Sequence, residues 1–132
     1  MTTNVGQVGT YLVNGTAGKV GTPGAKILHF TLVVNAVSGK VTGQAKQTQA
    51  VQGPASEISI QITAGHVRAT GLGKFTKVVW LSGNGIESVP PPAIGTWLVP
   101  FEASFAIDDS WNGVGGWTLG GSSVDDVPVK SD

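Results

Sequence analysis

The stretch KILHFTLVVNAVSGKVTGQAKQTQAV, residues 26–51, contains two strand patterns separated by a turn signal. In its first half every second side chain is apolar, and this face reads Leu28, Phe30, Leu32, Val34 and Ala36. A period of two is typical of a β-strand, whose successive side chains point to opposite faces. The dipeptide Ser38-Gly39 interrupts the pattern with residues that favour a tight turn. The stretch therefore predicts an antiparallel hairpin with one buried face.

The second half of this stretch, residues 40–51, differs in the size of its inward side chains. One face is polar, and the other carries Val41, Gly43 and Ala45. Small inward residues suit a place where a barrel tapers or a strand bends sharply. This half therefore favours a closed or strongly curved sheet.

Two further segments show the same alternation. In residues 57–64 the apolar face reads Ile58, Ile60, Ile62 and Ala64. In residues 96–107 it reads Trp97, Val99, Phe101, Ala103, Phe105 and Ile107. Gly65, next to His66, marks a point where we expect a bulge to change the phase of the strand.

Glycine and proline, with 20 and 7 residues, cut the chain into strand-sized pieces. We expect Asn14-Gly15 and Asn84-Gly85 to open loops, and residues 122–132 to be partly frayed. The predicted strands lie near 8–14, 26–37, 40–51, 57–70, 74–82, 96–107, 114–119 and 124–129. Residues 1–132 are thus expected to form a single all-β domain, an antiparallel meander of seven or eight strands closed into a small barrel. A β-sandwich is the alternative, because it shows the same pattern.

Charge and cysteine content exclude several classes of function. Acidic and basic residues balance at eight each and make up only 12% of the chain, which argues against nucleic acid and anionic lipid as partners. No apolar stretch approaches the about 20 residues of a transmembrane helix. The absence of cysteine excludes disulfides and thiolate metal sites. Sparse charge favours a homo-oligomer or a surface covered by another protein.

The first residues lack the basic and apolar regions of a cleaved Sec signal peptide. The expected location is therefore cytoplasmic, or outside the cell by a route without such a signal.

Catalytic and metal-binding motifs are missing from the sequence. His29 and His66 are the only histidines, and neither belongs to a ligand set with metal spacing. There is no Gly-x-Ser-x-Gly elbow, and Glu102 falls on the polar face of its strand. We therefore assign no catalytic residue, no metal and no cofactor.

Weak candidates for ligand binding lie near the C-terminus. Residues 108–113 resemble the start of a calcium loop, but position twelve is Leu119 where an acidic ligand is expected, so a turn is favoured. A tryptophan in a turn or beside glycines is able to stack on a sugar ring or to lie at a protein interface. The candidate ligand-binding residues are Trp111, Trp117, Asp108, Asp109 and Asn112.

Two stretches resemble a small bacterial family known as a domain of unknown function. The first joins a Gly-x-Pro-Gly segment at Gly21–Gly24 to a Leu-His-Phe strand and a Gly-x-Val-x-Gly-x-Ala-x-x-Thr-Gln-Ala strand that begins at Gly39. The second comprises the acidic turn Asp108–Trp111 and the segment Val124–Lys130. The resemblance implies no activity, substrate or site residue.

The sequence therefore predicts a non-enzymatic binding or protein-interaction module. One alternative is a lipocalin-like barrel with an interior ligand site, lined by Phe30, Phe101, Phe105 and Trp97 around a polar group. Another is a secreted lectin or toxin-type effector that acts on a glycan or membrane through Trp111 and the glycine-rich C-terminal hairpin.

Overall fold

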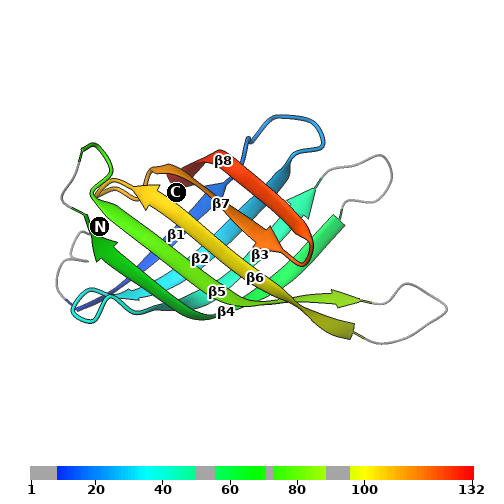
Figure 1. Cartoon of the computed structure of the whole chain (residues 1–132), viewed down its shortest axis with the longest axis horizontal. Helices are drawn as coiled ribbons and strands as arrows, with labels where there is room; N and C mark the ends of the chain where they lie inside the picture. Colours follow the sequence, from blue (N-terminus) through cyan, green and yellow to red (C-terminus); the bar gives the residue numbers. More distant parts are fainter. Residues whose placement is uncertain (1–8, 50–55, 71–72, 89–95) are drawn as a thin grey trace.

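The computed structural model describes residues 9–49, 56–70, 73–88 and 96–132. Within them the chain forms eight strands, in which each pairs antiparallel with the next and β8 pairs with β1. This closure confirms the predicted barrel and rules out the sandwich (Figure 1). The described residues include no helix able to span a membrane. The strands are β1 Thr10–Ala17, β2 Lys26–Asn35, β3 Val41–Gln49, β4 Ser56–Ala69, β5 Lys77–Ser88, β6 Thr96–Ile107, β7 Gly113–Leu119 and β8 Ser122–Ser131.

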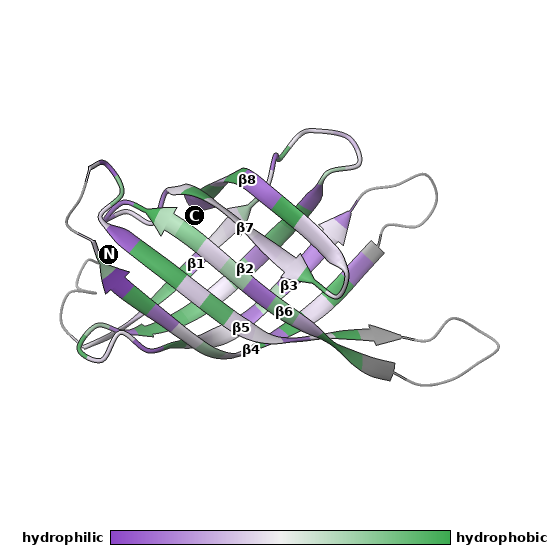
Figure 2. Cartoon of the chain, viewed as in Figure 1, coloured by the Kyte–Doolittle hydropathy of each residue, from purple (hydrophilic) through white to green (hydrophobic). Residues whose placement is uncertain are grey.

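Apolar and polar residues alternate along the strands, as the sequence predicts (Figure 2). Each strand contributes apolar side chains that point into the barrel, where they form one continuous core. Phe101, Phe105, Leu28 and Leu32 are among the largest fully buried side chains. The interior is thus a packed core, which is what eight strands enclose when side chains fill the barrel.

Two phenylalanines lie across glycines at the centre of this core. Phe30 pairs with Gly15 on β1, and Phe105 pairs with Gly115 on β7. The two rings contact each other, with centroids 5.6 Å apart. A Cβ at either glycine would collide with the ring opposite it, so glycine is needed for the rings to meet. Rings covering glycines are a known device for stabilising curved sheets.

Three strands are longer than the sequence predicts. β1 runs through Asn14-Gly15 because Gly15 faces inward beneath the Phe30 ring. β5 continues through Asn84-Gly85, where Gly85 is packed against core side chains. β8 remains paired as far as Ser131, whose N–H donates to Asn112 Oδ1 at 3.0 Å, so the predicted fraying is wrong.

A bulge in β4 sets the orientation of the strand's second half. The register with β5 shifts between Ile62 and Ala64, so the predicted change of phase occurs just before Gly65. Ala64, which we expected on the buried face, is therefore exposed, and His66 also faces outward. The predicted inward side chain of Trp97 lies outside the described residues.

Candidate functional site

Four of the five predicted ligand-binding residues lie in the turn between β6 and β7. Asp108 organises this turn: its Oδ1 accepts hydrogen bonds from the backbone N–H of Ser110 at 2.8 Å and of Asn112 at 3.0 Å. Asn112 Oδ1 in turn accepts from β8. These oxygens already bond to backbone N–H groups, which explains why an aspartate and an asparagine fit here without a ligand.

Trp111 adopts φ of 65°, a left-handed conformation that few side chains other than glycine, asparagine and aspartate adopt. Although it lies in a turn, Trp111 is only 4% exposed and belongs to the core. Its Nε1 donates to the hydroxyl of Tyr11 at 3.3 Å. Burial of a large ring thus offsets an unfavourable backbone conformation, and no ring face is left for a sugar.

Asp109 is tied to the start of β5. Its Oδ1 accepts from Thr76 Oγ1 at 2.7 Å and from Lys77 Nζ at 3.4 Å. The hydrogen bond from Thr76, then the hydrogen bond and charge of Lys77, hold the pKa of Asp109 below its ordinary value. The Asp109 carboxylate thus links the β6–β7 turn to the residues at the start of β5.

Trp117, the fifth candidate, points into the barrel and is 2% exposed. Its Nε1 donates to Oε1 of Gln47, a buried side chain on β3, at 2.8 Å. The bond crosses the interior between strands that are not neighbours. The structure therefore does not bring the five candidates together around one ligand, and ligand binding through them stays a prediction. No group of three or more metal-binding side chains occurs in the described part of the chain.

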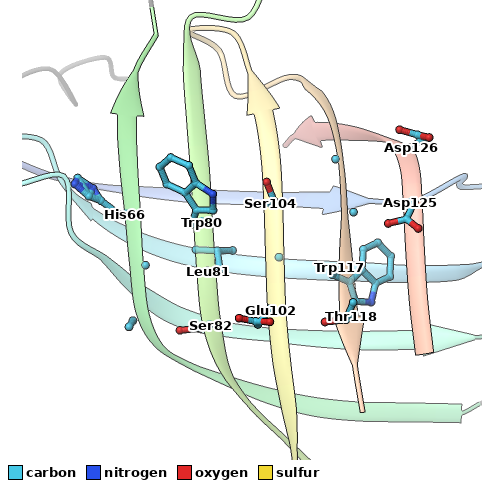
Figure 3. Close-up of a pocket in the computed structure, with 15 residues that line it drawn as sticks. His66, Trp80, Leu81, Ser82, Glu102, Ser104, Trp117, Thr118, Asp125 and Asp126 are labelled. Carbon is cyan, nitrogen blue, oxygen red and sulfur yellow. The ribbon is translucent and has the colours of Figure 1, made fainter. Parts of the chain in front are cut away.

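A groove of about 800 Å³ crosses the outer surface of the barrel from β4 to β8. Small residues, among them Ser82, Ser104 and Gly116, line it. Figure 3 shows Ser104 between the taller side chains of Trp80 and Asp125. We call this feature the outer groove; Glu102 and Thr118 also line it. A second hollow of about 450 Å³ lies over β1 to β5, and we call it the second groove.

The side chains of the outer groove form two rows across the strands. The register places Trp80 of β5 beside Ser104 of β6, which pairs in turn with Gly116 of β7. The next row contains Ser82, Glu102 and Thr118, again from three consecutive strands. Figure 3 shows both rows, with Asp125 beyond β7 at the far end of the first. Cross-strand neighbours are close together, so the rows present a continuous set of hydroxyl and carboxylate groups beside an indole.

A second bulge shapes the far end of the outer groove. One residue of β7, Gly116, lies opposite two residues of β8, Asp125 and Asp126, and Asp126 adopts φ of 53°. A Cβ on Gly116 would lie 3.0 Å from the Cα of Asp125 and would collide with the carbonyl of Val124. Bulges re-aim side chains and occur often beside functional sites. Here the bulge leaves both aspartates exposed at the groove.

The hydroxyl and carboxylate groups of the outer groove have no hydrogen-bond partner among the described residues. Among the described residues, the side chains of Ser82, Glu102, Ser104 and Asp125 take part in none of the hydrogen bonds or ion pairs. The two ion pairs of the described chain, Lys46–Glu57 and Lys77–Asp109, lie elsewhere. The outer groove thus differs from the β6–β7 turn, where each carboxylate already has partners within the protein.

Trp80 is 44% exposed, the one tryptophan among the exposed large apolar side chains of the described residues. The guanidinium carbon of Arg68 lies 5.7 Å from the centre of its ring. This distance is within the range of a cation–π contact, which helps to hold the indole upright on the surface. An upright, partly exposed indole beside free polar groups is an arrangement suited to binding.

The second groove has a different character. Its polar side chains come from adjacent strands, and Thr31 donates to Asn14 at 2.9 Å. Its one phenylalanine, Phe30, is buried. Polar groups that bond to one another and the absence of an exposed indole in this described lining make it the weaker candidate site.

Sequence reasoning missed Trp80, Ser104 and Asp125 as site residues. A signal for Trp80 was present: Val79 and Leu81 flank it as inward residues, so alternation turns Trp80 outward. No signal in the sequence places Asp125 near Trp80, because their distance depends on the pairing of β5 through β8. The outer groove is therefore a product of tertiary structure.

Comparison with proteins of curated function gives no match. Residues 8–122 match a family described as a domain of unknown function, DUF1842. This match covers most of the chain and agrees with the expected resemblance. The protein belongs to the DUF1842 family.

Proposed function

We propose that this protein is a non-enzymatic binding module whose ligand occupies the outer groove. The observation that carries the proposal is the exposed indole of Trp80 beside hydroxyl and carboxylate groups that have no partner among the described residues. Side chains that fold a protein usually satisfy their polar groups internally or scatter them over the surface. A set gathered in one hollow beside an aromatic ring is typical of a ligand site.

The filled interior argues against the lipocalin-like alternative. Phe30, Phe101 and Phe105, which such a site would use as its lining, are at most 2% exposed and pack in the continuous core. Gln47, the one buried polar side chain among the residues whose burial is described, is already bonded to Trp117. A ligand inside the barrel would have to displace this packing, whereas the outer groove is accessible as it stands.

The environment of the carboxylates favours binding over catalysis. Glu102 and Asp125 are both exposed, whereas the general acid of an enzyme such as lysozyme lies in an apolar pocket. Among the described residues neither carboxylate bonds to a histidine, so neither is the acidic member of a hydrogen-bonded catalytic triad.

A screen of small neutral, cationic and anionic compounds by NMR tests this function. In the ¹⁵N-labelled protein, we expect bound compounds to shift the amide signals of residues such as Ser104 and Thr118 and the indole signal of Trp80. The bound compounds should be recovered chemically unchanged. Hits confined to the second groove or the interior, or chemical conversion of a hit, would overturn the proposal.

A second candidate function, self-association, is favoured by the projecting end of the β5–β6 hairpin. This end extends past the other strands (Figure 1), and from Glu87 and from Val99 outward the two strands pair only with each other in the described chain. Ile86, which also pairs with Ser59 of β4, and Leu98 form a cross-strand pair at the base of this end and are 45% and 64% exposed. A two-stranded ribbon is only marginally stable alone, so a second copy is a suitable cover for this pair.

Light scattering coupled to size-exclusion chromatography tests self-association. We expect a dimer at micromolar concentration, shifted toward monomer by the charged variant Leu98→Lys. The variant Leu12→Lys is a matched control, because Leu12 is similarly exposed on β1, away from this hairpin. A monomeric wild type, or equal effects of the two variants, would count against the hairpin as the interface.

A further inference from the structure

We propose that the ligand of the outer groove is a neutral oligosaccharide, laid across β5 to β8 with one sugar ring stacked on Trp80. This inference rests on the proposed function and names its ligand class. It follows from the chemistry of four groups that line the groove, Trp80, Glu102, Ser104 and Asp125, and from their order across the strands.

The indole of Trp80 supplies the large exposed apolar face of the outer groove. A pyranose ring has C–H groups on its faces and hydroxyls around its edge. Stacking therefore buries the apolar side of the sugar against the indole while its hydroxyls remain available. Trp80 keeps 44% of its surface exposed even with Arg68 over its ring, so area remains for such a contact. An indole loses little conformational entropy on binding, since it has only two rotatable bonds.

The neighbouring polar groups fit the hydroxyls of a sugar. Carboxylates accept hydrogen bonds at two oxygens, and charged acceptors form stronger bonds than neutral ones. Ser104 and Thr118 each offer a hydroxyl that donates and accepts. Glu102 lies between Ser82 and Thr118 in the second row, within reach of a ligand stacked in the first. The groove thus pairs mostly acceptors with a ligand rich in donors.

Charge in the outer groove disfavours anionic ligands. Of the described residues that line it, Glu102, Asp125 and Asp126 are acidic and none is a lysine or arginine, so the single guanidinium of Arg68 over Trp80 is outnumbered. Phosphates, sulfated sugars and sialic acids would be repelled by this surface. An organic cation is disfavoured for another reason: the Arg68 guanidinium lies over Trp80 at 5.7 Å, so a second cation on this ring would meet a like charge. A neutral polyol avoids both conflicts.

The length of the outer groove favours a chain over a single sugar. From β5 to β8 there are three interstrand spacings, and at about 4.8 Å each they span about 14 Å. This is longer than one sugar ring, so rings next to the stacked one are able to reach Asp125. The groove lies on the outer wall of the barrel, which lets a chain continue past either end.

Titration of the ¹⁵N-labelled full chain with soluble oligosaccharides tests the ligand class. The probes are oligomers of glucose, mannose, galactose, xylose and N-acetylglucosamine, from one to six units, with sialyllactose and spermine as charged probes. We expect at least one neutral series to shift the signals of Ser104 and Trp80, with affinity that rises with chain length. Trp80→Ala should weaken binding about tenfold or more, because anchoring aromatics dominate binding energy.

Two variants make this result specific to the outer groove. Gly116→Ala places a Cβ against the backbone of Val124 and Asp125, so it should displace the bulge and weaken binding, while amide signals outside β7 and β8 keep their positions. Gln44→Ala in the second groove is the matched control and should leave the affinity unchanged. Equal binding of a neutral oligosaccharide to wild type and Trp80→Ala would overturn the inference.

The remaining outcomes separate the inference from the proposed function. If only spermine or sialyllactose binds in the outer groove, the groove is a binding site but the sugar assignment is wrong. If no compound of any class binds there, both are wrong. Hydrolysis of a bound oligosaccharide, detected as shorter products, would contradict the non-enzymatic proposal and leave the ligand class standing.

Discussion

The β6–β7 turn and the outer groove both combine a tryptophan with acidic residues, but only in the turn are these groups already bonded. In the turn, Trp111 is buried and Asp108 accepts two backbone hydrogen bonds. In the outer groove, Trp80 is exposed and Glu102 has no partner among the described residues. The same residue types therefore stabilise the fold in one place and remain available to a ligand in the other.

This difference teaches that composition alone does not identify a binding site. Both regions contain residues that commonly bind sugars or calcium, and the sequence drew attention to the turn. The deciding property is whether hydrogen-bonding capacity has been used within the protein, because a group with a satisfied partner gains little from a ligand. Substitutions in the turn should therefore lower stability, whereas substitutions in the outer groove should weaken ligand binding and leave stability nearly unchanged.

The largest expected effect is that of Trp111→Ala. Removing this buried ring should cost about 3–5 kcal/mol of unfolding free energy, the usual range for a core tryptophan. Trp80→Ala should cost about 1 kcal/mol or less, since it removes one exposed cation–π contact. Urea denaturation followed by circular dichroism measures both. Similar losses of unfolding free energy in the two variants would contradict the proposed difference between the turn and the outer groove.

A smaller effect is expected for Asp108→Ala. This variant removes an acceptor of two backbone hydrogen bonds and should cost about 1–2 kcal/mol. Ser110→Ala in the same turn is the control, because its side chain makes none of the hydrogen bonds described for this turn. Glu102→Gln is the corresponding carboxylate substitution in the outer groove. Both should stay within about 0.5 kcal/mol of wild type. A destabilised Glu102→Gln would show that this carboxylate has a structural role after all.

The bond between Trp111 and Tyr11 should make a contribution of its own. Tyr11→Phe leaves the indole N–H of Trp111 without its acceptor and should cost about 0.5–1.5 kcal/mol. Its effect should shrink in the background of Trp111→Ala, because the partner is then missing. A double-mutant cycle measures this coupling, and strictly additive losses would mean that the 3.3 Å contact contributes nothing.

The smallest effect concerns the pH dependence of Asp109. Its folded-state pKa is lowered, first by the hydrogen bond from Thr76 and then by Lys77, so the ionised form stabilises the fold. This stabilisation is present above the unfolded pKa and is lost as the pH falls below about 4, through the lowered folded value. Asp109→Asn should flatten the stability profile in this acid range. NMR titration of its carboxyl carbon measures the pKa directly, and an ordinary or raised value would contradict the expectation.

Much of the fold was predictable because burial follows the strand period. The alternation of Leu28, Phe30 and Leu32 identified an inward face that the structure confirms. Short links without helical inserts favoured pairing between successive strands, and this order is observed. Strand ends were less predictable: Asn14-Gly15 is a common turn sequence, yet the ring of Phe30 requires a glycine there within a strand.

The candidate site was much less predictable than the fold. Turn and glycine neighbours allowed Trp111 and Trp117 to be either exposed or packed, and only the tertiary contacts show that both rings are buried. The alternation along β5 indicates that Trp80 points outward, but whether an outward indole lies in a binding site depends on the residues of neighbouring strands. Asp125 is 45 positions away along the chain, and only the register from β5 to β8 and the bulge opposite Gly116 bring it to the same groove.

The sequence by itself determined the strand pattern and the inward faces, because these depend on local periodicity and on the burial of apolar area. Tertiary structure alone decided which polar groups are left unbonded, because that depends on partners far away in the chain. Closure of β8 on β1 paired the last strand, and the β6–β7 turn used its own aspartates. In the part of the chain that the structure describes, the acceptors left without a partner beside an exposed indole are those of the outer groove.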